Sequence, residues 1–375
     1  MFQLCSSVRH GARPAASRIR ARNLPHGLAR LDSPNSAPLR EVWYYGVPGH
    51  YLKPGRTRAK TILGEPVLFG RDHAGAVFAL RDVCPHRGMP FSRGRFDGRE
   101  IECCYHGWRF DTAGRCTAIP SLVADQTFEP GRIKVAAYPV REVQGNVWIF
   151  FGEDPAAAPE IPVLPGLADR PADLIERTRL DAGIDHAVVG LMDPAHGPFV
   201  HSAWWWRSRR SIHEKAKAFE PSPFGFTMVR HAPSRNSNAY RILGGKPETE
   251  ISFRLPSVRI EHVRIGRHTL CNLTALTPID DRATEITTAL YWTMPWLSLL
   301  KPVLRPLVRK FLGQDRDVMT MQQAGLAHRP TLMLIDDADT QAKWYHRLKL
   351  EYARARAESR PFENPVKPRV LRWRS

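Results

Sequence analysis

Acidic residues are scarce relative to basic ones in this chain of 375 residues. The 37 Asp and Glu stand against 55 Lys and Arg, so the formal net charge is +18. A field of this sign favours anionic partners, namely nucleic acid, an acidic protein or an anionic membrane surface. The sequence lacks both zinc-finger spacing and the aromatic motif of RNA-recognition sheets, so we expect no nucleic-acid partner.

Long apolar runs are also missing. No uninterrupted run reaches the roughly 18 residues that a membrane-spanning helix needs, so we expect a soluble or peripheral protein. Cysteine is sparse, with six residues in the chain, and two of them fall into a pattern with histidines. Such a pattern indicates a reducing compartment rather than a disulfide framework. We therefore expect a cytoplasmic protein, either free or in peripheral contact with a membrane.

The length exceeds one ordinary core and suits two domains. Residues 1–40 hold seven Arg, no Lys and a single acid, Asp32, and this composition predicts a disordered basic segment. A targeting segment would have the same composition, and so would an overlong predicted start of the chain. These alternatives stay open.

Residues 41–159 predict a small all-β domain. Short apolar runs alternate there with Gly and Pro, as in strands joined by tight turns. A stretch rich in Pro and Ala, 154–166, interrupts this pattern and predicts a domain boundary near residue 160. The clearest apolar runs are 61–70, 76–80 and 146–152.

Residues 160–375 predict an α+β domain. A helical segment at 183–203 precedes four strand-like runs, and helices return from about residue 297. Strands that are grouped between helices favour an α+β arrangement over a parallel βαβ sheet. The strand-like runs span 224–231, 250–264, 268–277 and 283–294.

The strongest local pattern is Cys84-Pro-His86, followed after sixteen residues by Cys103-Cys104-Tyr-His106. Two thiolates and two imidazoles could bind one structural zinc ion, so zinc is the alternative. The segments CPHRG and CCYHGWRFD resemble the two loops of Rieske oxygenase α subunits. This resemblance implies a [2Fe–2S] cluster in which Cys84 and Cys103 hold one iron and His86 and His106 hold the other.

Cys103 and Cys104 are adjacent, and only one of them can be the fourth ligand. The C-x2-H spacing selects Cys103. Cys104 would then lie on the opposite side of an extended strand, where we expect a small buried thiol. We expect the same of Cys116 and Cys271.

A second pattern, Asp193-x2-His196-x4-His201, lies further along the chain. Two histidines at this spacing point about 140° apart on a regular helix, which is poor geometry for one metal. Pro198 lies between them, and we expect it to disrupt the helix so that the imidazoles can approach each other. In a chain that also carries the first motif, this pair resembles the iron-binding histidines of Rieske oxygenases. The segment MDPAHGPFVH is similar to the corresponding segment of the pheophorbide-oxygenase-like branch.

A 2-His-1-carboxylate site needs a third ligand. We expect residues 313–323 to open a C-terminal helix, and this segment resembles the carboxylate motif of the family. The resemblance implies Asp315 as a ligand of a mononuclear Fe(II). Asp317 is the competing residue, although a place in the first turn of the helix would let it complement the helix dipole instead.

Asp193 has a separate predicted role, because its place three residues before His196 matches the bridging aspartate of the family. By this resemblance Asp193 is a catalytic residue that links a cluster histidine of one subunit to an iron-binding histidine of its neighbour, and the protein is a homotrimer. A helix-cap or turn role before Pro194 is the alternative.

The resemblance implies the oxygenase component of a multicomponent monooxygenase, with an N-terminal Rieske [2Fe–2S] domain and an α+β helix-grip, START-like catalytic domain. O2 would be the oxidant. Electrons would come from NAD(P)H through a separate ferredoxin or flavin reductase, because the chain lacks a plant-type ferredoxin Cys set and a flavin or nicotinamide fingerprint.

Apolar and aromatic residues crowd the predicted iron site, notably Met192, Phe199 and the Trp residues at 204–206. Residues 294–313 mix Leu, Val and Trp with basic residues, as a basic interfacial helix does, and a helix packed on the core would have the same composition. We expect hydroxylation or oxidative demethylation of a bulky apolar polycycle such as a sterol or triterpenoid. The alternatives are an aromatic-acid oxygenase and a non-catalytic Rieske electron carrier.

Overall fold

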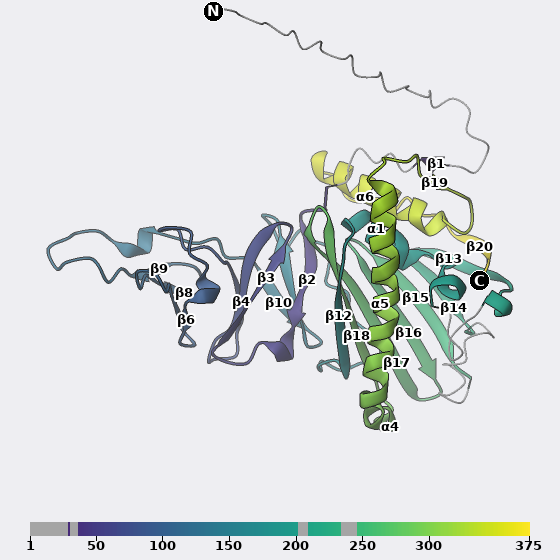
Figure 1. Cartoon of the computed structure of the whole chain (residues 1–375), viewed down its shortest axis with the longest axis horizontal. Helices are drawn as coiled ribbons and strands as arrows, with labels where there is room; N and C mark the ends of the chain where they lie inside the picture. The colour runs from purple at the N-terminus through teal and green to yellow at the C-terminus, as the bar shows by residue number, and fades with distance from the viewer. Residues whose placement is uncertain (1–28, 31–36, 202–208, 234–245) are drawn as a thin grey trace, which may run out of the picture.

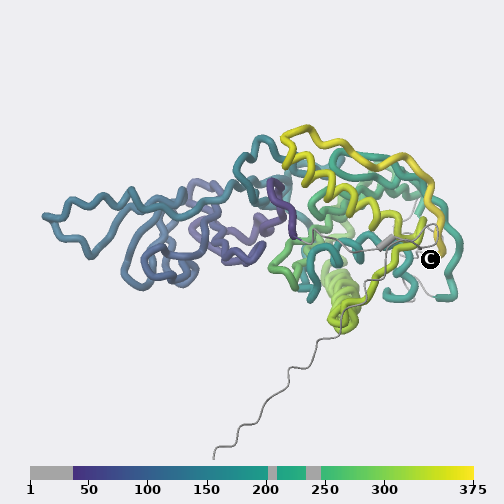
Figure 2. Tube along the Cα trace, turned by 90° about the horizontal axis from the view of Figure 1, so that it is seen from above, coloured from purple at the N-terminus to yellow at the C-terminus, as the bar shows by residue number. Residues whose placement is uncertain are grey.

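A computed structural model describes residues 29–30, 37–201, 209–233 and 246–375. An elongated all-β arm from the first part of the chain leads into a larger body of helices and one large sheet (Figure 1). The view from above shows the arm extending from one end of the body (Figure 2). The predicted fold class, an all-β domain followed by an α+β domain, is confirmed.

The arm consists of short antiparallel strands in three small sheets. The run 61–70 is a hairpin rather than one strand, since Leu63 and Gly64 both have positive φ (56° and 75°), as a tight two-residue turn requires. Single-turn 3-10 helices lie at Gly49–Tyr51, Phe91–Arg93, Pro130–Arg132 and, in the body, Arg209–Ser211. The strands are β2 (Val42–Pro48), β3 (Arg56–Ile62), β4 (Glu65–Arg71), β5 (Val77–Arg81), β6 (Arg95–Phe96), β7 (Glu100–Glu102), β8 (Arg109–Asp111), β9 (Cys116–Ala118), β10 (Val140–Val143) and β11 (Asn146–Phe151).

The body is built on an eight-stranded antiparallel sheet in the order β12-β18-β17-β16-β15-β14-β13-β20. The predicted run 250–264 was wrong as a single strand: Pro256 has no N–H for a strand ladder, and the chain turns there between β15 and β16. The strands are β12 (Leu174–Leu180), β13 (Glu214–Ser222), β14 (Gly225–His231), β15 (Glu248–Arg254), β16 (Val258–Ile265), β17 (His268–Asp280), β18 (Ala283–Trp292) and β20 (Arg369–Arg374).

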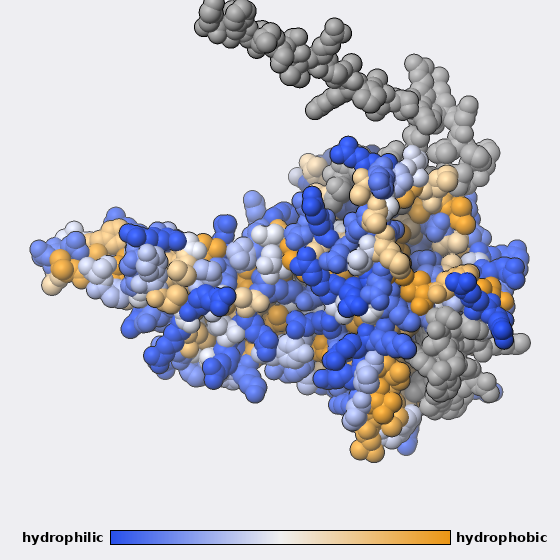
Figure 3. Space-filling model, viewed as in Figure 1, coloured by the Kyte–Doolittle hydropathy of each residue, from blue (hydrophilic) through white to orange (hydrophobic). Residues whose placement is uncertain are grey.

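Helices complete the body: α1 (Ile184–Met192), α2 (Gly197–Val200), α4 (Pro295–Leu299), α5 (Lys301–Leu326) and α6 (Thr340–Ala357). The prediction that a helix opens at 313 was wrong, because α5 begins twelve residues earlier, at Lys301. Pro302 lies in its first turn, where the missing N–H costs nothing, and Pro306 is accommodated inside the helix. The α4 end of this helix pair carries an apolar patch (Figure 3).

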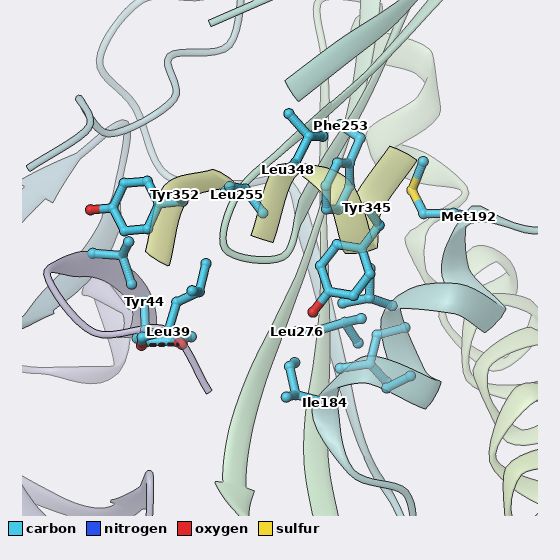
Figure 4. Close-up of a cluster of buried hydrophobic side chains, with 14 of the residues drawn as sticks. Leu39, Tyr44, Ile184, Met192, Phe253, Leu255, Leu276, Tyr345, Leu348 and Tyr352 are labelled. Atoms are coloured by element: carbon cyan, nitrogen blue, oxygen red, sulfur yellow. Dashed lines mark hydrogen bonds between the residues drawn. The ribbon is translucent and has the colours of Figure 1, made fainter. Parts of the chain in front are cut away.

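One hydrophobic core joins the arm to the body. Tyr345, Leu348 and Tyr352 of α6 pack in the same cluster as Tyr44 of β2 (Figure 4). The Tyr352 hydroxyl donates to the carbonyl of Glu41 at 2.6 Å, across the junction. The body sheet contacts the arm through its other face as well, where β17 and β18 are buried on both sides. The arm is therefore held firmly on the body.

Between arm and body, residues 152–173 form neither helix nor strand, and the predicted boundary near residue 160 stays a prediction. Of the predicted basic segment 1–40, only Ala29–Arg30 (β1, paired with β19, Met333–Leu334) and 37–40 fall within the described residues. The Trp residues at 204–206 lie outside them. No helix in the described part of the chain combines the length and apolar character needed to cross a membrane.

Candidate metal centres

The first predicted cluster loop, 84–89, closes on itself through its backbone. The N–H of Cys84 donates to the carbonyl of Met89 (2.8 Å), and the N–H of Gly88 donates to the carbonyl of Cys84 (2.9 Å). Gly88 has a φ of 72°, a left-handed conformation that glycine adopts without steric cost. The loop thus holds His86 in a tight turn above a buried cysteine.

The second loop, 103–108, repeats this pattern. Cys103 donates to the carbonyl of Trp108 (2.9 Å), its own carbonyl accepts from Gly107 (3.0 Å), and Gly107 has a φ of 70°. The rings of His86 and His106 meet with their centroids 4.5 Å apart. The structure therefore brings the two predicted histidines together from equivalent turns.

The two predicted cysteines also meet. Cys84 and Cys103 are buried, and their thiols lie within hydrogen-bonding reach. Burial raises the pKa of Cys84 to about 11, and the nearby backbone N–H groups of His86 and Arg87 oppose this shift. Those N–H groups are placed to stabilise a thiolate once a metal replaces the proton.

These four donors do not form a site for one ion. Among the described residues, the only group of three His, Cys, Asp or Glu ligand atoms within 4.8 Å of one another lies elsewhere. Ligands of one tetrahedral zinc would all lie within about 3.8 Å of one another, given its bond lengths. Cysteine is paired with cysteine and histidine with histidine, which is the arrangement that two metal positions require.

Cys104 is exposed, so the prediction of a buried thiol there was wrong. The segment after Cys103 is a tight turn and not an extended strand, and the turn directs Cys104 outward. Cys116 and Cys271 are buried, as predicted.

The second candidate site lies between α1 and α2. Asp193 caps the C-terminus of α1, His196 is the N-cap of α2, and His201 is its C-cap. The predicted role of Pro198 was wrong: it lies in the first turn of α2, where proline is tolerated, and the break in the helix comes earlier, at Asp193. The two histidines therefore lie at opposite ends of a single helical turn.

Asp315 reaches these histidines from the middle of α5. Its Oδ1 lies 3.1 Å from His201 Nε2 and 3.9 Å from His196 Nε2, and the two Nε2 atoms are 3.1 Å apart. Asp317 points away, is 63% exposed and pairs with Arg316. The structure thus brings Asp315, and not Asp317, to the two histidines.

Both imidazoles are oriented through their other nitrogen. His196 Nδ1 lies 2.7 Å from the backbone carbonyl of Asp193, and His201 Nδ1 lies 3.1 Å from Gln314 Oε1. Each oxygen accepts a hydrogen bond from Nδ1–H, so each Nε2 keeps its lone pair for a metal. Burial lowers the pKa of His196, although the carboxylates of Asp193 and Asp315 oppose the effect. The neutral, ligating form is therefore favoured.

Sequence reasoning missed two residues of this site, Gln314 and Phe311. The ring of Phe311 stacks on His201 with centroids 3.6 Å apart and an angle of 13°. Phe311 lies one helical turn before Asp315, and Gln314 directly precedes it. Once Asp315 is placed on a helix, the i, i+4 relation predicts that Phe311 shares its face.

A cavity of about 280 Å³ lies beside the triad. Its opposite wall is the body sheet, where Met228, Ile251, Glu261 and Asn272 stand directly across neighbouring strands. Apolar side chains from the helices close the other side, and cations line the wall together with the carboxylates of Asp193, Glu261 and Asp315. The cations that line it are Lys215, Lys217 and Arg259.

Two protein families match the chain. Residues 42–139 match the family described as the Rieske [2Fe-2S] domain. Residues 188–351 match the family described as the vanillate O-demethylase oxygenase C-terminal domain. The chain belongs to the Rieske non-haem iron oxygenases. Members of this family are oxidoreductases, and their oxygenase components work with a separate ferredoxin or reductase.

Known Rieske oxygenases resemble the chain over different lengths. The 4β-methylsterol monooxygenase of Methylococcus capsulatus is 28% identical, with 90% of this chain and 96% of that protein covered. The oxygenase subunit of 3-chlorobenzoate-3,4-dioxygenase from Comamonas testosteroni is 31% identical, but the match spans 45% of this chain and 39% of that protein. A crystal structure of dicamba monooxygenase bound to dicamba has a TM-score of 0.65 at 20% identity, covering 84% of this chain and all of the other.

The residues of both sites fit the iron groups of a Rieske oxygenase, a [2Fe–2S] cluster and a mononuclear iron. His106 Nδ1 is buried without a hydrogen-bond partner, which is costly unless a metal or another group engages it. His196, His201 and Asp315 bring three hard or borderline donors together, as iron requires.

Proposed function

We propose that this chain is the oxygenase component of a Rieske monooxygenase. The observation that carries the proposal is the convergence of a 2-His-1-carboxylate set from α2 and α5 beside a cavity. When bound, the iron groups supply the stepwise reduction of O2, which side chains cannot perform. In this proposal Cys84, His86, Cys103 and His106 hold the [2Fe–2S] cluster, and His196, His201 and Asp315 hold the mononuclear iron.

We assign Asp193 a bridging role. Its Oδ1 accepts the N–H of Ala195 (2.7 Å) and fixes the turn, whereas Oδ2 lies 3.7 Å from His196 Nδ1. The side chain is 33% exposed, so a neighbouring subunit can reach it. One carboxylate would thus serve both predicted roles, the turn and a link to a cluster histidine of the next subunit in a homotrimer.

For the substrate we propose a bulky apolar polycycle such as a sterol or triterpenoid, which the enzyme hydroxylates or oxidatively demethylates. The likeness to the methylsterol monooxygenase extends over almost the whole of both chains. Met192, Met228, Ile251 and Phe311 give the cavity an apolar surface for such a skeleton.

The second candidate substrate is an aromatic acid, and Lys217 in the cavity wall favours it. Lys217 is half-buried, donates to the carbonyl of Ala232 (3.2 Å) and forms no ion pair with a carboxylate among the described residues. A partly desolvated ammonium that is not paired with a carboxylate favours an anion. The 3-chlorobenzoate-3,4-dioxygenase subunit, whose name gives an aromatic carboxylate, is 31% identical over 45% of this chain and 39% of its own length.

The proposed electron source is NAD(P)H through a separate ferredoxin or flavin reductase, and the proposed location is the cytoplasm. The purified protein should be red-brown, with about three iron atoms per chain: two from the cluster and one from the triad. A colourless, iron-free, well-folded preparation would contradict the proposal.

Turnover assays test the proposed substrates and the role of Asp193. The protein, coupled to a ferredoxin and reductase, should be offered 4-methylated sterols and substituted benzoates, with product and peroxide both measured. Lys217→Met should raise the KM for a benzoate at least tenfold and leave a neutral sterol unaffected. Asp193→Asn should retain all iron yet stop turnover, whereas the exposed control Asp317→Asn should remain active. Normal turnover by Asp193→Asn would remove Asp193 from the electron path.

A further inference from the structure

The end of the body formed by α4 and the first turn of α5 carries a surface that the proposed reaction does not use. Four large apolar side chains are exposed there: Trp296 (41%), Leu299 (81%), Leu300 (39%) and Val303 (60%). Figure 3 shows them as an apolar patch at the tip of a largely hydrophilic face. We call this surface, Trp296 to Val303, the α4–α5 tip.

The α4–α5 tip is well supported from within. Leu297, between the exposed residues, is buried against Trp292 and Met294 in a separate hydrophobic cluster of the body. The indole N–H of Trp292 donates to Ser298 Oγ at 3.0 Å. The segment is therefore an ordered element with one apolar side packed inward and a second apolar side facing outward. Such a contiguous outward patch is typical of an interaction site.

Basic side chains flank the tip along α5. Lys301, Arg305 and Arg309 are 39%, 55% and 66% exposed. Two acidic partners are nearly buried and too few to neutralise the three cations. Lys301 lies 3.7 Å from Asp173, just before β12, while Arg305 and Arg309 share Glu176 of β12 at 3.4 and 3.3 Å. The solvent-facing side of this region therefore carries a net positive charge next to the apolar patch.

We propose that the α4–α5 tip docks on the surface of an anionic lipid bilayer. Trp296, Leu299 and Val303 would enter the boundary between headgroups and acyl chains, and the flanking cations would contact anionic headgroups. A second copy of the chain is a poor occupant, because it would bring two basic surfaces together on a protein with a formal charge of +18. The contact goes beyond the proposed reaction and does not depend on it.

The tip is remote from the candidate iron site, so its effect on membrane binding can be measured separately from effects on the iron. Val303 and Asp315 lie twelve residues apart on α5, or about 18 Å along the helix axis. Substitutions at the tip should therefore leave iron content and the visible spectrum unchanged, and both serve as controls for folding.

The experiment is vesicle flotation of the full-length holoprotein. Vesicles of phosphatidylcholine with 30% phosphatidylglycerol should carry the protein upward, and pure phosphatidylcholine vesicles much less. Leu299→Glu with Val303→Glu should weaken binding at least tenfold. Val163→Glu, at a 62% exposed valine outside the tip, is the matched control and should bind like the wild type. Raising the salt to 0.5 M should weaken binding because the flanking cations are screened.

Three results would overturn the proposal: no flotation of the wild-type protein on anionic vesicles, equal flotation of the tip variant, or an equal loss in the Val163 control. If the double variant fails to retain iron, Leu299→Gln alone is tested by the same criteria. The oligomeric state of the tip variant is measured by sedimentation velocity. A change of oligomeric state relative to the wild type would show that the tip is a protein interface and would refute lipid docking.

Discussion

Gln314 offers the sharpest test of how the iron site is organised. His201 is only 3% exposed, and Gln314 Oε1 is the acceptor for its Nδ1–H at 3.1 Å. Gln314→Met keeps the length of the side chain but removes the acceptor. A buried donor left without a partner costs about 1–3 kcal/mol, and loss of such a partner behind a metal ligand typically lowers metal affinity about 10–100-fold. Gln314→Glu keeps an acceptor and should bind metal nearly as tightly as the wild type.

The assay is a titration of the mononuclear site with Fe(II) under anaerobic conditions, after a chelator has removed the metal and left the cluster intact. A 10–100-fold loss corresponds to about 1.4–2.7 kcal/mol in binding free energy. Gln322→Met is the same substitution on an exposed part of α5 and should have little effect. If Gln314→Met binds Fe(II) as tightly as this control, Gln314 does not orient His201.

Three further outcomes are expected. Cys103→Ser should abolish the visible absorbance of the cluster and Cys104→Ser should preserve it; loss in both would contradict the assignment. Gly88→Ala should destabilise its loop by about 1–2 kcal/mol because of its φ of 72° alone. Gly107→Ala should destabilise its loop more, since a Cβ there also meets a neighbouring side chain at 3.1 Å. The cluster should therefore bleach at a lower urea concentration in Gly107→Ala than in Gly88→Ala. Burial lowers the pKa of Lys217, so its charge is lost at a lower pH than that of an ordinary lysine. Benzoate binding, measured by calorimetry, should therefore weaken as the pH rises through that pKa. Binding that does not change with pH would refute a role for this charge.

The sequence predicted ligand positions best where the ligands of a pair lie within one short loop. Cys84 and His86, and Cys103 and His106, each belong to a loop whose backbone hydrogen bonds close within six residues, so a short motif is enough to specify the geometry. The burial of Cys104 could not be predicted in this way, because the segment after Cys103 is a turn and alternation between faces holds only in an extended strand.

Contacts between distant segments were harder to predict. His196 and His201 are close in sequence, but Asp315 arrives from a helix more than a hundred residues later, and only resemblance to a family motif pointed to it. Lys217 and Arg259 line one cavity because strands of the body sheet align in a particular register. Register is fixed by the packing of the whole sheet and is not written in either strand alone.

Iron content is the best test of whether one chain holds both a cluster and a separate iron. The wild-type protein should contain about three iron atoms per chain, with a rhombic EPR signal on reduction that reports the cluster. Asp315→Asn should contain about two and keep that signal, whereas Asp317→Asn should still contain about three. Three irons in Asp315→Asn, or loss of the cluster signal together with the third iron, would show that Asp315 does not hold a separate iron.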